Sequence, residues 1–263
     1  MTLTPDDLAR RGLRLATDGA VATVTLDRPE RRNAMTPGLW HGLAEIGASL
    51  PPQVRVVVIR GAGPSFSAGI DLRMLSADGV PGEPPLPRPD TPEFDAAVAS
   101  FQAGYLWLRD PAIVSVAAVR GHAIGAGCQL ALACDLRILA DDARLCLKET
   151  ALGLVPDLTG TKPLVDIVGL PRALELCLTA RTVDAAEARE LRLAELVVPA
   201  AELDAAVADL TAALLAADAA AARAAKALLA QAAANTLEQQ AAAERRAQAA
   251  LMRGRLAAGS AQS

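Results

Sequence analysis

The chain has 263 residues, of which 52% are apolar and only 2% aromatic, a composition typical of globular rather than disordered proteins. Its 26 basic and 30 acidic residues give a net charge of −4 without a long Lys/Arg run, which argues against a nucleic-acid partner. No stretch reaches the ~18 apolar residues of a membrane span, and MTLTPDDLARR at the start has no apolar signal core. The four cysteines form no CxxC pair and there are two histidines, so we expect reduced cysteines, no metal site and a cytoplasmic location.

The expected elements alternate between strands and helices. Residues 12–26 alternate apolar and polar side chains around Asp18-Gly19, which predicts a β-hairpin. Thr36-Pro37 supplies an N-cap followed by proline at N1, so a helix is expected from there to about Leu50. Buried strands are predicted at 54–59 and 113–119, and shorter strands at 136–139, 145–147 and 196–198.

The other segments are a proline-rich loop and an alanine-rich tail. Residues 76–92 contain six prolines and two glycines, which predicts a mobile surface loop. A helical pattern runs from Ala200 to Gly259, and 25 of the 50 residues from 201 to 250 are alanine. We therefore expect an α/β fold with a core at 1–199 and, at 200–263, a helical region that forms a packing or oligomerisation layer.

Two glycine-rich turns follow the strands at 54–59 and 113–119. The first is FSAGIDL at 66–72, and the second is GHAIGAGCQL at 121–130. Each alone is explained more simply as a tight connection from a strand to a helix. Together they can hold one oxygen atom between two backbone N–H groups, because the first N–H groups of a helix have no internal partner. Asp71 in the first turn is expected to cap a helix rather than to act in catalysis.

The spacing of these turns matches one family. From about Gly12 to Ala234 the chain resembles the enoyl-CoA hydratase/isomerase (crotonase) superfamily, through LDRPERRNAM, FSAGIDL and VRGHAIGAGCQLALACDLRI, and through KETALGLVPDLTGT and LTARTVDAAEARELRLAELVVP. The resemblance implies a crotonase-like spiral of ββα units with C-terminal trimerisation helices, assembled as a homotrimer or a dimer of trimers. It also implies acyl-CoA thioester substrates and no cofactor beyond the coenzyme A of the substrate.

The resemblance also places the substrate. The thioester oxygen would lie between the backbone N–H groups of Ile70 and Ala126, where enolate charge accumulates, and one such donor is typically worth ~10²–10³ in rate. Arginines in a polar loop are more often only solvated, but here they are candidates for contacts with the CoA phosphates, and Arg32 is one of them. The expected CoA-binding residues are Arg28, Arg31, Asn33, Ala34 and Ala68.

Acid/base residues decide the reaction. Hydratases of the family use two glutamates, and Glu149 stands at one of these positions whereas Gln129 replaces the other. An amide cannot exchange a proton at working pH, so double-bond isomerisation with one base is favoured over hydration. Asp157, eight residues after Glu149, resembles an acid of the dienoyl-CoA isomerase branch. It is equally well explained as a cap of a helix beginning near Thr159.

Two further hypotheses concern the function and the cover of the site. The alternative function is a catalytically silent acyl-CoA-binding protein of the same fold, although a pure binder needs no carboxylate at the position of Glu149. The end of the chain, LMRGRLAAGSAQS, departs from the family because it lacks an aromatic residue that would close over the CoA. The loop at 76–92 is a candidate lid over the acyl chain.

Overall fold

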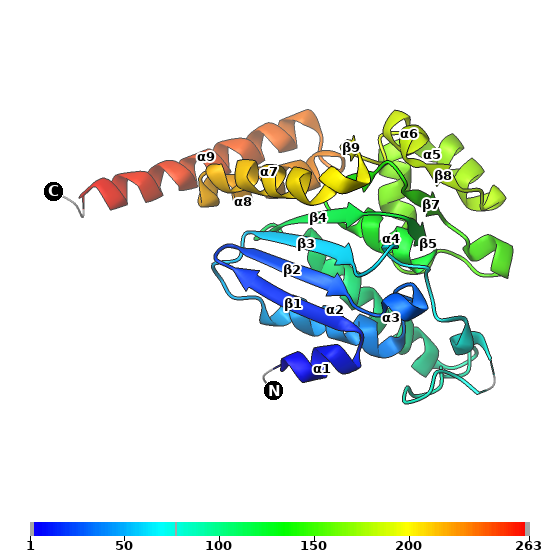
Figure 1. Ribbon diagram of the computed structural model, residues 1–263. Helices are drawn as coiled ribbons and strands as arrows, with labels where there is room; N and C mark the ends of the chain where they lie inside the picture. Colours follow the sequence, from blue (N-terminus) through cyan, green and yellow to red (C-terminus); the bar gives the residue numbers. More distant parts are fainter. Residues whose placement is uncertain (1–2, 77, 261–263) are drawn as a thin grey trace.

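A six-stranded sheet forms the centre of the molecule in the computed structural model, which describes residues 3–76 and 78–260 (Figure 1). The first two strands pair in antiparallel fashion, and each later neighbour pairs in parallel. The carboxyl ends of the parallel strands therefore lie at one edge of the sheet. In sheet order the strands are β1 (Leu13–Asp18), β2 (Val21–Leu26), β3 (Val56–Gly61), β4 (Val114–Val119), β6 (Leu136–Ala140) and β9 (Leu196–Val198).

A smaller sheet, formed by β5 (His122–Ile124), β7 (Arg144–Cys146) and β8 (Val183–Asp184), stands next to the first. β5 lies inside the second glycine-rich turn, so this turn runs through a strand before the helix α4 (Ala126–Ala133) begins. The first turn leads into the short 3₁₀ helix η2 (Leu72–Leu75) rather than an α-helix. The sequence pattern showed neither detail, because three- and four-residue elements are too short to produce a periodic signal.

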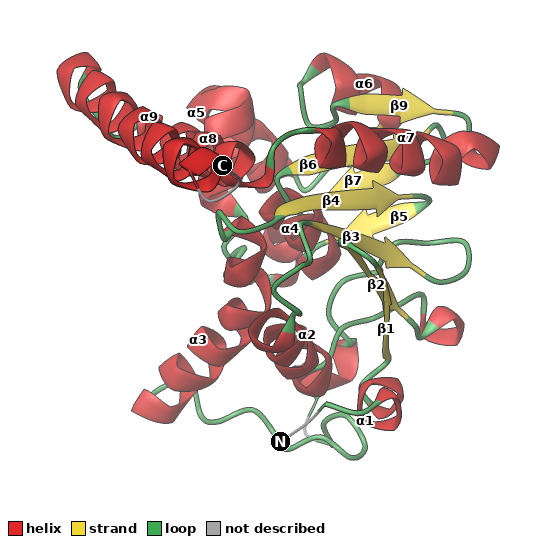
Figure 2. Cartoon of the chain, turned by 90° about the vertical axis from the view of Figure 1, so that its left-hand side faces the viewer, coloured by secondary structure: helices red, strands yellow, loops and turns green. Residues whose placement is uncertain are grey.

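Helices cover both faces of the large sheet (Figure 2). Val57 and Ile59 of β3 point into the main core, which includes apolar residues of α2 (Pro37–Ser49) and α3 (Pro92–Leu106). Val56 and Val58 point to the opposite face, where α7 (Leu203–Ala216) packs. Successive side chains of a strand alternate between faces, so the continuous run of valines in β3 reflects burial on both sides.

Most of the expected elements are confirmed. The hairpin forms with Asp18 opposite Val21, and the side chain of Thr36 accepts a hydrogen bond from the N–H of Leu39 at the start of α2. Residues 78–91 contain no helix or strand. The pattern analysis missed α1 (Pro5–Arg10), whose capping box between Thr4 and Asp7 is a readable signal.

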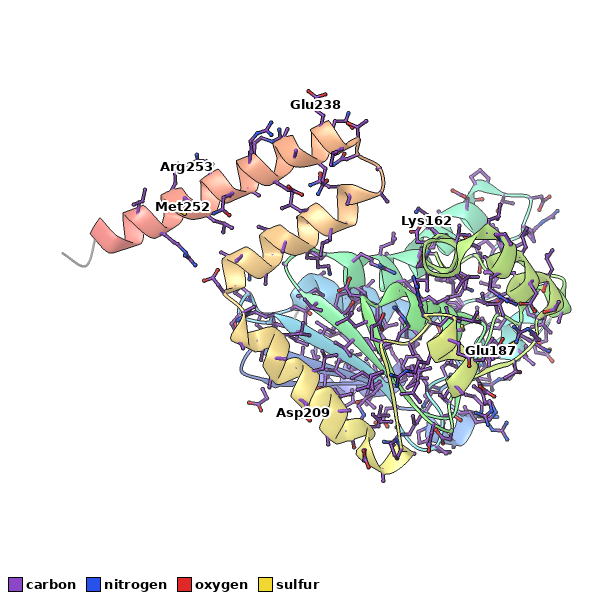
Figure 3. The ribbon with its side chains drawn as sticks, turned by 90° about the horizontal axis from the view of Figure 1, so that it is seen from above. Lys162, Glu187, Asp209, Glu238, Met252 and Arg253 are labelled. Atoms are coloured by element: carbon purple, nitrogen blue, oxygen red, sulfur yellow. The ribbon has the colours of Figure 1, made fainter. Side chains whose placement is uncertain are left out.

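The C-terminal helices divide into two groups. α7 begins after the expected boundary at residue 200 but completes the core of the sheet, whereas α8 (Ala219–Ala232) and α9 (Leu237–Ser260) form an arm that extends away from the body (Figures 1 and 3). Figure 3 shows Glu238 at the end of α9 near α8, and Met252 and Arg253 farther out. The remaining elements are α5 (Thr161–Thr179), α6 (Ala185–Glu190), η1 (Pro29–Arg31), η3 (Trp107–Arg109), η4 (Glu149–Leu152) and η5 (Ala200–Glu202).

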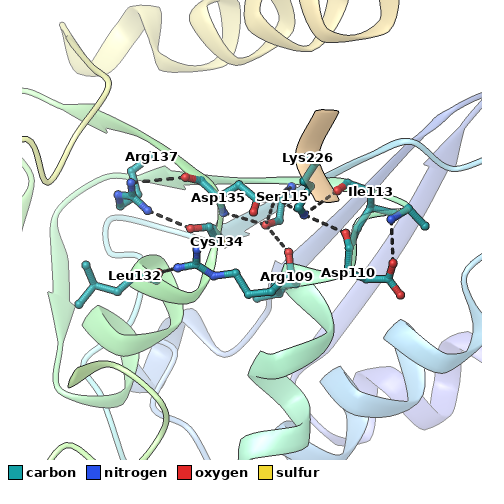
Figure 4. Close-up of polar contacts among 11 residues, drawn as sticks. Arg109, Asp110, Ile113, Ser115, Leu132, Cys134, Asp135, Arg137 and Lys226 are labelled. Carbon is teal, nitrogen blue, oxygen red and sulfur yellow. Dashed lines mark hydrogen bonds and ion pairs between the residues drawn. The ribbon is translucent and has the colours of Figure 1, made fainter. Parts of the chain in front are cut away.

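One lysine ties the arm to the body (Figure 4). Lys226 of α8 donates to the carbonyl oxygens of Asp110 and Ile113, at 2.8 and 2.7 Å. It also pairs with Oδ2 of Asp135 at 2.7 Å, and Ser115 donates to the same carboxylate. Because both charged side chains are largely buried, this pair fixes the position of α8 more firmly than an exposed pair would.

Among the described residues, no single helix is long and apolar enough to cross a membrane. Only the residues of η5 and α7 together with α8, which meet at a bend of 102°, reach the required length and composition as a pair.

Candidate active site

A cavity of about 570 Å³, called the main cavity below, lies beside the two glycine-rich turns. Its walls come from both turns, from η2 and α3, and from the segment that runs from Lys148 to Leu158. Most of the lining is apolar. The polar side chains among the described lining residues, apart from the indole of Trp40, are Gln129, Lys148, Glu149 and Asp157. Such a largely apolar cavity with a few polar groups is typical of a small-molecule site.

The two turns touch at Gly69. This residue has φ of +92°, and a Cβ there would lie 2.7 Å from the carbonyl oxygen of Ile124 and 3.7 Å from the backbone nitrogen of Ala126. Only glycine fits such a contact. Ser67 reinforces it, because its N–H donates to His122 and its carbonyl oxygen accepts from Ile124. The turns are therefore held together by backbone hydrogen bonds.

No described residue accepts a hydrogen bond from the N–H groups of Ile70 and Ala126 at this contact. Met35 donates to the carbonyl of Gly69 and accepts from the N–H of Asp71, so the N–H of Ile70 between them points away from Met35. Ala126 is the first residue of α4, where an N–H has no acceptor inside the helix. Both residues line the main cavity. Two such donors facing one cavity could hold one anionic oxygen between them.

Gln129 is fully anchored by its neighbours. Its Oε1 accepts hydrogen bonds from the backbone N–H groups of Leu158, at 2.9 Å, and Gly160, at 3.2 Å. This fixes the direction of the amide, because the oxygen must face those two donors. The Nε2 then donates to Oε1 of Glu149 at 2.6 Å. Residues 129 and 149 are therefore in direct contact.

Glu149 keeps one oxygen without a partner. Oε1 accepts from Gln129, whereas Oε2 is buried and has no hydrogen-bond partner in the described part of the chain. Burial raises the pKa of this carboxyl above its usual value, and the hydrogen bond from Gln129 opposes that shift only in part. A Cβ at Gly125 would lie 3.2 Å from Oε1, so glycine at this position allows the close approach. The free oxygen is suited to accept a proton.

Asp157 is the second acidic side chain of the main cavity. Burial raises the pKa of its carboxyl, and its charge in turn raises the pKa of Glu149 slightly. Of the two explanations left open for Asp157, the helix cap is wrong, because α5 begins at Thr161 with Gly160 as N-cap and no side-chain capping bond. This carboxylate lines the main cavity without capping a helix, so it remains free for another role.

The five expected CoA-binding residues lie in one region, but their side chains differ in availability. Asn33 is fully buried, and its amide bonds to the backbone of Arg28, Ala62 and Ser65, so only its backbone could face a ligand. Arg28 donates to the carbonyl of Ala34. Arg31 is exposed, Ala34 is half-buried, and Ala68 lines the main cavity.

Asp71 has a structural role, as expected. Its side chain caps η2 by accepting from the N–H of Arg73, and it binds the guanidinium of Arg73 at 2.9 and 2.6 Å. Arg28 lies 3.5 Å from the same carboxylate. The hydrogen bond from Arg73 lowers the pKa of Asp71 to about 2, so this carboxylate is a fixed anion rather than a proton acceptor.

One wall of the main cavity, which α3 contributes, was not expected from the sequence. Phe94, Val98 and Phe101 line the main cavity from this helix, and their spacing of four and three residues is the helical pattern that would have revealed them. A second unexpected residue is Tyr105, whose fully buried phenol donates to the carbonyl of Ala126 at 3.0 Å. Within the described chain, no three His, Cys, Asp or Glu side chains come together to hold a metal ion.

Curated relatives share the sequence pattern. A family model for enoyl-CoA hydratase/isomerase matches residues 16–255. The chain is 34% identical over 188 residues to a "probable enoyl-CoA hydratase" of Mycobacterium tuberculosis, which covers 71% of this chain and 68% of the relative. It is also 34% identical over 184 residues to the peroxisomal Δ(3,5)-Δ(2,4)-dienoyl-CoA isomerase of Arabidopsis thaliana, with 69% and 66% covered.

Solved structures share the fold. A Thermobifida fusca YX protein provisionally classed as an enoyl-CoA hydratase, solved in complex with CoA, has a TM-score of 0.93 at 62% identity, covering 97% of this chain and 98% of that chain. An enoyl-CoA hydratase of Bacillus anthracis has a TM-score of 0.82 at 28% identity, covering 92% and 91%. These matches confirm the resemblance seen in the sequence, and the residues matched by the family model include both turns. The chain belongs to the enoyl-CoA hydratase/isomerase (crotonase) family.

Proposed function

We propose that this protein isomerises the double bond of enoyl-CoA thioesters, with Glu149 as the base. The observation that carries the proposal is the contact between Gln129 and Glu149. The amide oxygen of Gln129 is held by two backbone N–H groups, so its nitrogen donates to Glu149 and leaves one carboxylate oxygen unpartnered. A single positioned base at a pair of oxyanion donors is what double-bond migration requires.

The reaction follows from this arrangement. The thioester oxygen accepts hydrogen bonds from the N–H groups of Ile70 and Ala126. Oε2 of Glu149 takes a proton from the carbon next to the thioester carbonyl, and the electron pair moves to the oxygen as a dienolate. Return of the proton two carbons farther along completes the shift of the double bond. Asp157 is the candidate to hold or deliver this proton when the acceptor carbon lies beyond the reach of Glu149.

Hydration is less favourable in this site. Two-carboxylate hydration needs one group to activate water and another to supply a proton. The Gln129 amide cannot exchange a proton at working pH. Its nitrogen and its oxygen are both hydrogen-bonded to protein, so turning it away from Glu149 would break these bonds. The alternative of a catalytically silent acyl-CoA-binding protein is less favoured, because binding alone does not require the buried, unpartnered oxygen of Glu149.

Substrate and assembly form part of the same proposal. The complexes of the Thermobifida fusca protein with CoA and with acetoacetyl-CoA support an acyl-CoA ligand, and the proposed chemistry uses no cofactor beyond that CoA. Exposed leucines on α5 and on the arm, among them Leu178, Leu229 and Leu237, support assembly with further copies, as a homotrimer or a dimer of trimers. We propose the cytoplasm as the location.

A substrate panel tests the reaction. The purified protein is given 2-enoyl-, 3-enoyl- and 3,5-dienoyl-CoA thioesters, and the ultraviolet absorbance of the conjugated thioester is followed. We expect conjugation of the 3-enoyl or 3,5-dienoyl substrate to be faster than loss of the 2-enoyl absorbance by hydration. Faster hydration would show a hydratase. If no substrate reacts although acyl-CoA at ~100 times its dissociation constant stabilises the fold by ~2.7 kcal/mol, the protein is a binder.

A further inference from the structure

A second cavity, of about 230 Å³, adjoins the main cavity. Pro37 at the start of α2 forms one side of it, and Gly79, Val80 and the segment from Glu83 to Leu86 form another. Among the described residues, Met74 of η2 and Leu86 line both cavities. These two side chains therefore form the partition between the main cavity and the second cavity.

The far side of the second cavity is attached to α2, whereas the side chains of the partition are only half-buried. The carboxylate of Glu83 accepts the N–H of Gly38 at 2.9 and 3.1 Å, which attaches this segment to the positive end of α2. Val80 is buried. Met74 and Leu86 are only half-buried at the margin of the main core, and an unbranched methionine adapts its shape easily. Truncation of the partition would thus open one cavity into the other without removing the attachment to α2.

We propose that Met74 and Leu86 set the longest acyl chain that the enzyme accepts. This inference rests on the proposed function, because it treats the main cavity as the acyl site. An acyl chain gains affinity as long as its methylenes reach the apolar walls of the main cavity. A longer chain must displace Met74 or Leu86, so each further carbon adds nothing until the partition opens. The preferred substrates are then thioesters of short to medium, unsubstituted acyl groups.

Binding of saturated thioesters isolates this effect, because they contain no double bond to react. Dissociation constants of butanoyl-, octanoyl- and dodecanoyl-CoA are measured by calorimetry on the full chain. In the wild type we expect tighter binding from butanoyl to octanoyl and no further gain at dodecanoyl. Each buried methylene is worth about fourfold in affinity. In Met74→Ala and Leu86→Ala, the ratio of dodecanoyl-CoA to octanoyl-CoA affinity should therefore be at least about tenfold higher than in the wild type.

Val80→Ala is the matched control, because Val80 lines only the second cavity, so its truncation leaves the partition in place. Its ratio of dodecanoyl to octanoyl affinity should match the wild type. The proposal is overturned if neither partition variant changes that ratio, if the control changes it equally, or if the wild type already gains affinity up to dodecanoyl. Failure of all three thioesters to bind would overturn the proposed function instead. If thermal unfolding shows a variant to be misfolded, Met74→Val and Leu86→Val take its place.

Discussion

Asp71 in the first glycine-rich turn and Glu149 beside Gly125 of the second are two buried carboxylates, yet their environments shift their pKa values in opposite directions. Asp71 accepts hydrogen bonds from one arginine and lies beside a second, which lowers its pKa to about 2. Glu149 has no cationic partner among the described residues, and burial raises its pKa. One region therefore holds a permanent anion that fixes the chain, and the other holds a group that can gain and lose a proton.

The difference shows what makes a carboxylate structural or chemical in this molecule. Both residues are close to the backbone donors proposed for the thioester oxygen, so position along the turns does not separate them. Their partners do. Arginine stabilises the charge of Asp71, whereas an amide gives Glu149 one hydrogen bond and leaves its other oxygen free. Four substitutions test this comparison, from the largest expected effect to the smallest.

Glu149→Gln should give the largest effect. It keeps the size of the side chain but removes the base, so turnover of the 3-enoyl substrate should fall by ~10²–10⁴ with little change in thioester affinity. Above its unfolded pKa, the ionised carboxylate of Glu149 costs folding free energy, because burial raises the folded pKa. The variant should therefore be at least as stable as the wild type at pH 7. Unchanged turnover would exclude Glu149 as the base and make Asp157 the next candidate, which Asp157→Asn then tests.

Gly69→Ala should separate the two turns. Its Cβ would meet the carbonyl oxygen of Ile124 at 2.7 Å, so the backbone must shift and the N–H groups of Ile70 and Ala126 can no longer converge. We expect turnover to fall by ~10²–10³, the typical effect of losing one oxyanion donor. Gly19→Ala is the control, because Gly19 also has a positive φ but no described atom lies within 4 Å of its Cβ position. Equal losses of activity in both variants would refute the role of the contact.

Gln129→Glu converts the amide partner of Glu149 into a second carboxylate. The two groups would lie in direct contact, so repulsion should make them share one proton and add a titration between roughly pH 5 and 8. Hydration of a short 2-enoyl-CoA should rise at least about tenfold, which corresponds to ~1.4 kcal/mol of barrier. A pH–rate profile of both proteins on that substrate is the measurement. A wild type that already hydrates as fast as the variant would contradict the isomerase proposal.

Asp71→Asn should change stability rather than chemistry. It leaves Arg28 and Arg73 without their shared anion, and we expect a loss of about 1 kcal/mol because solvent screens the partly exposed Arg73. The folded pKa of about 2 lies below the unfolded value of 3.8. The contribution of Asp71 is therefore present above about pH 4 and lost as the pH falls toward 2. Urea unfolding at pH 7 and pH 3 measures both effects, with Asp90→Asn of the exposed Arg88–Asp90 pair as control.

Local sequence patterns determined the frame of the protein. The Asp18-Gly19 hairpin and the cap at Thr36 were predicted correctly because each depends on the preferences of a few adjacent residues. The position of Glu149 followed from the family motif. The strand β5 and the 3₁₀ helix η2 were missed because their few residues are held by neighbouring segments rather than by their own pattern.

The tertiary structure decided what each polar group in the site can do. Gln129 acquires its direction from the N–H groups of Leu158 and Gly160, about thirty residues later in the chain. Asp157 caps no helix, because α5 begins at Thr161, later than the start near Thr159 expected from the sequence. Hydrogen-bond partners and burial depend on segments that only folding brings together, and they set the pKa of a carboxylate. The sequence by itself therefore determined which groups are present, and the fold decided which one is free to take a proton.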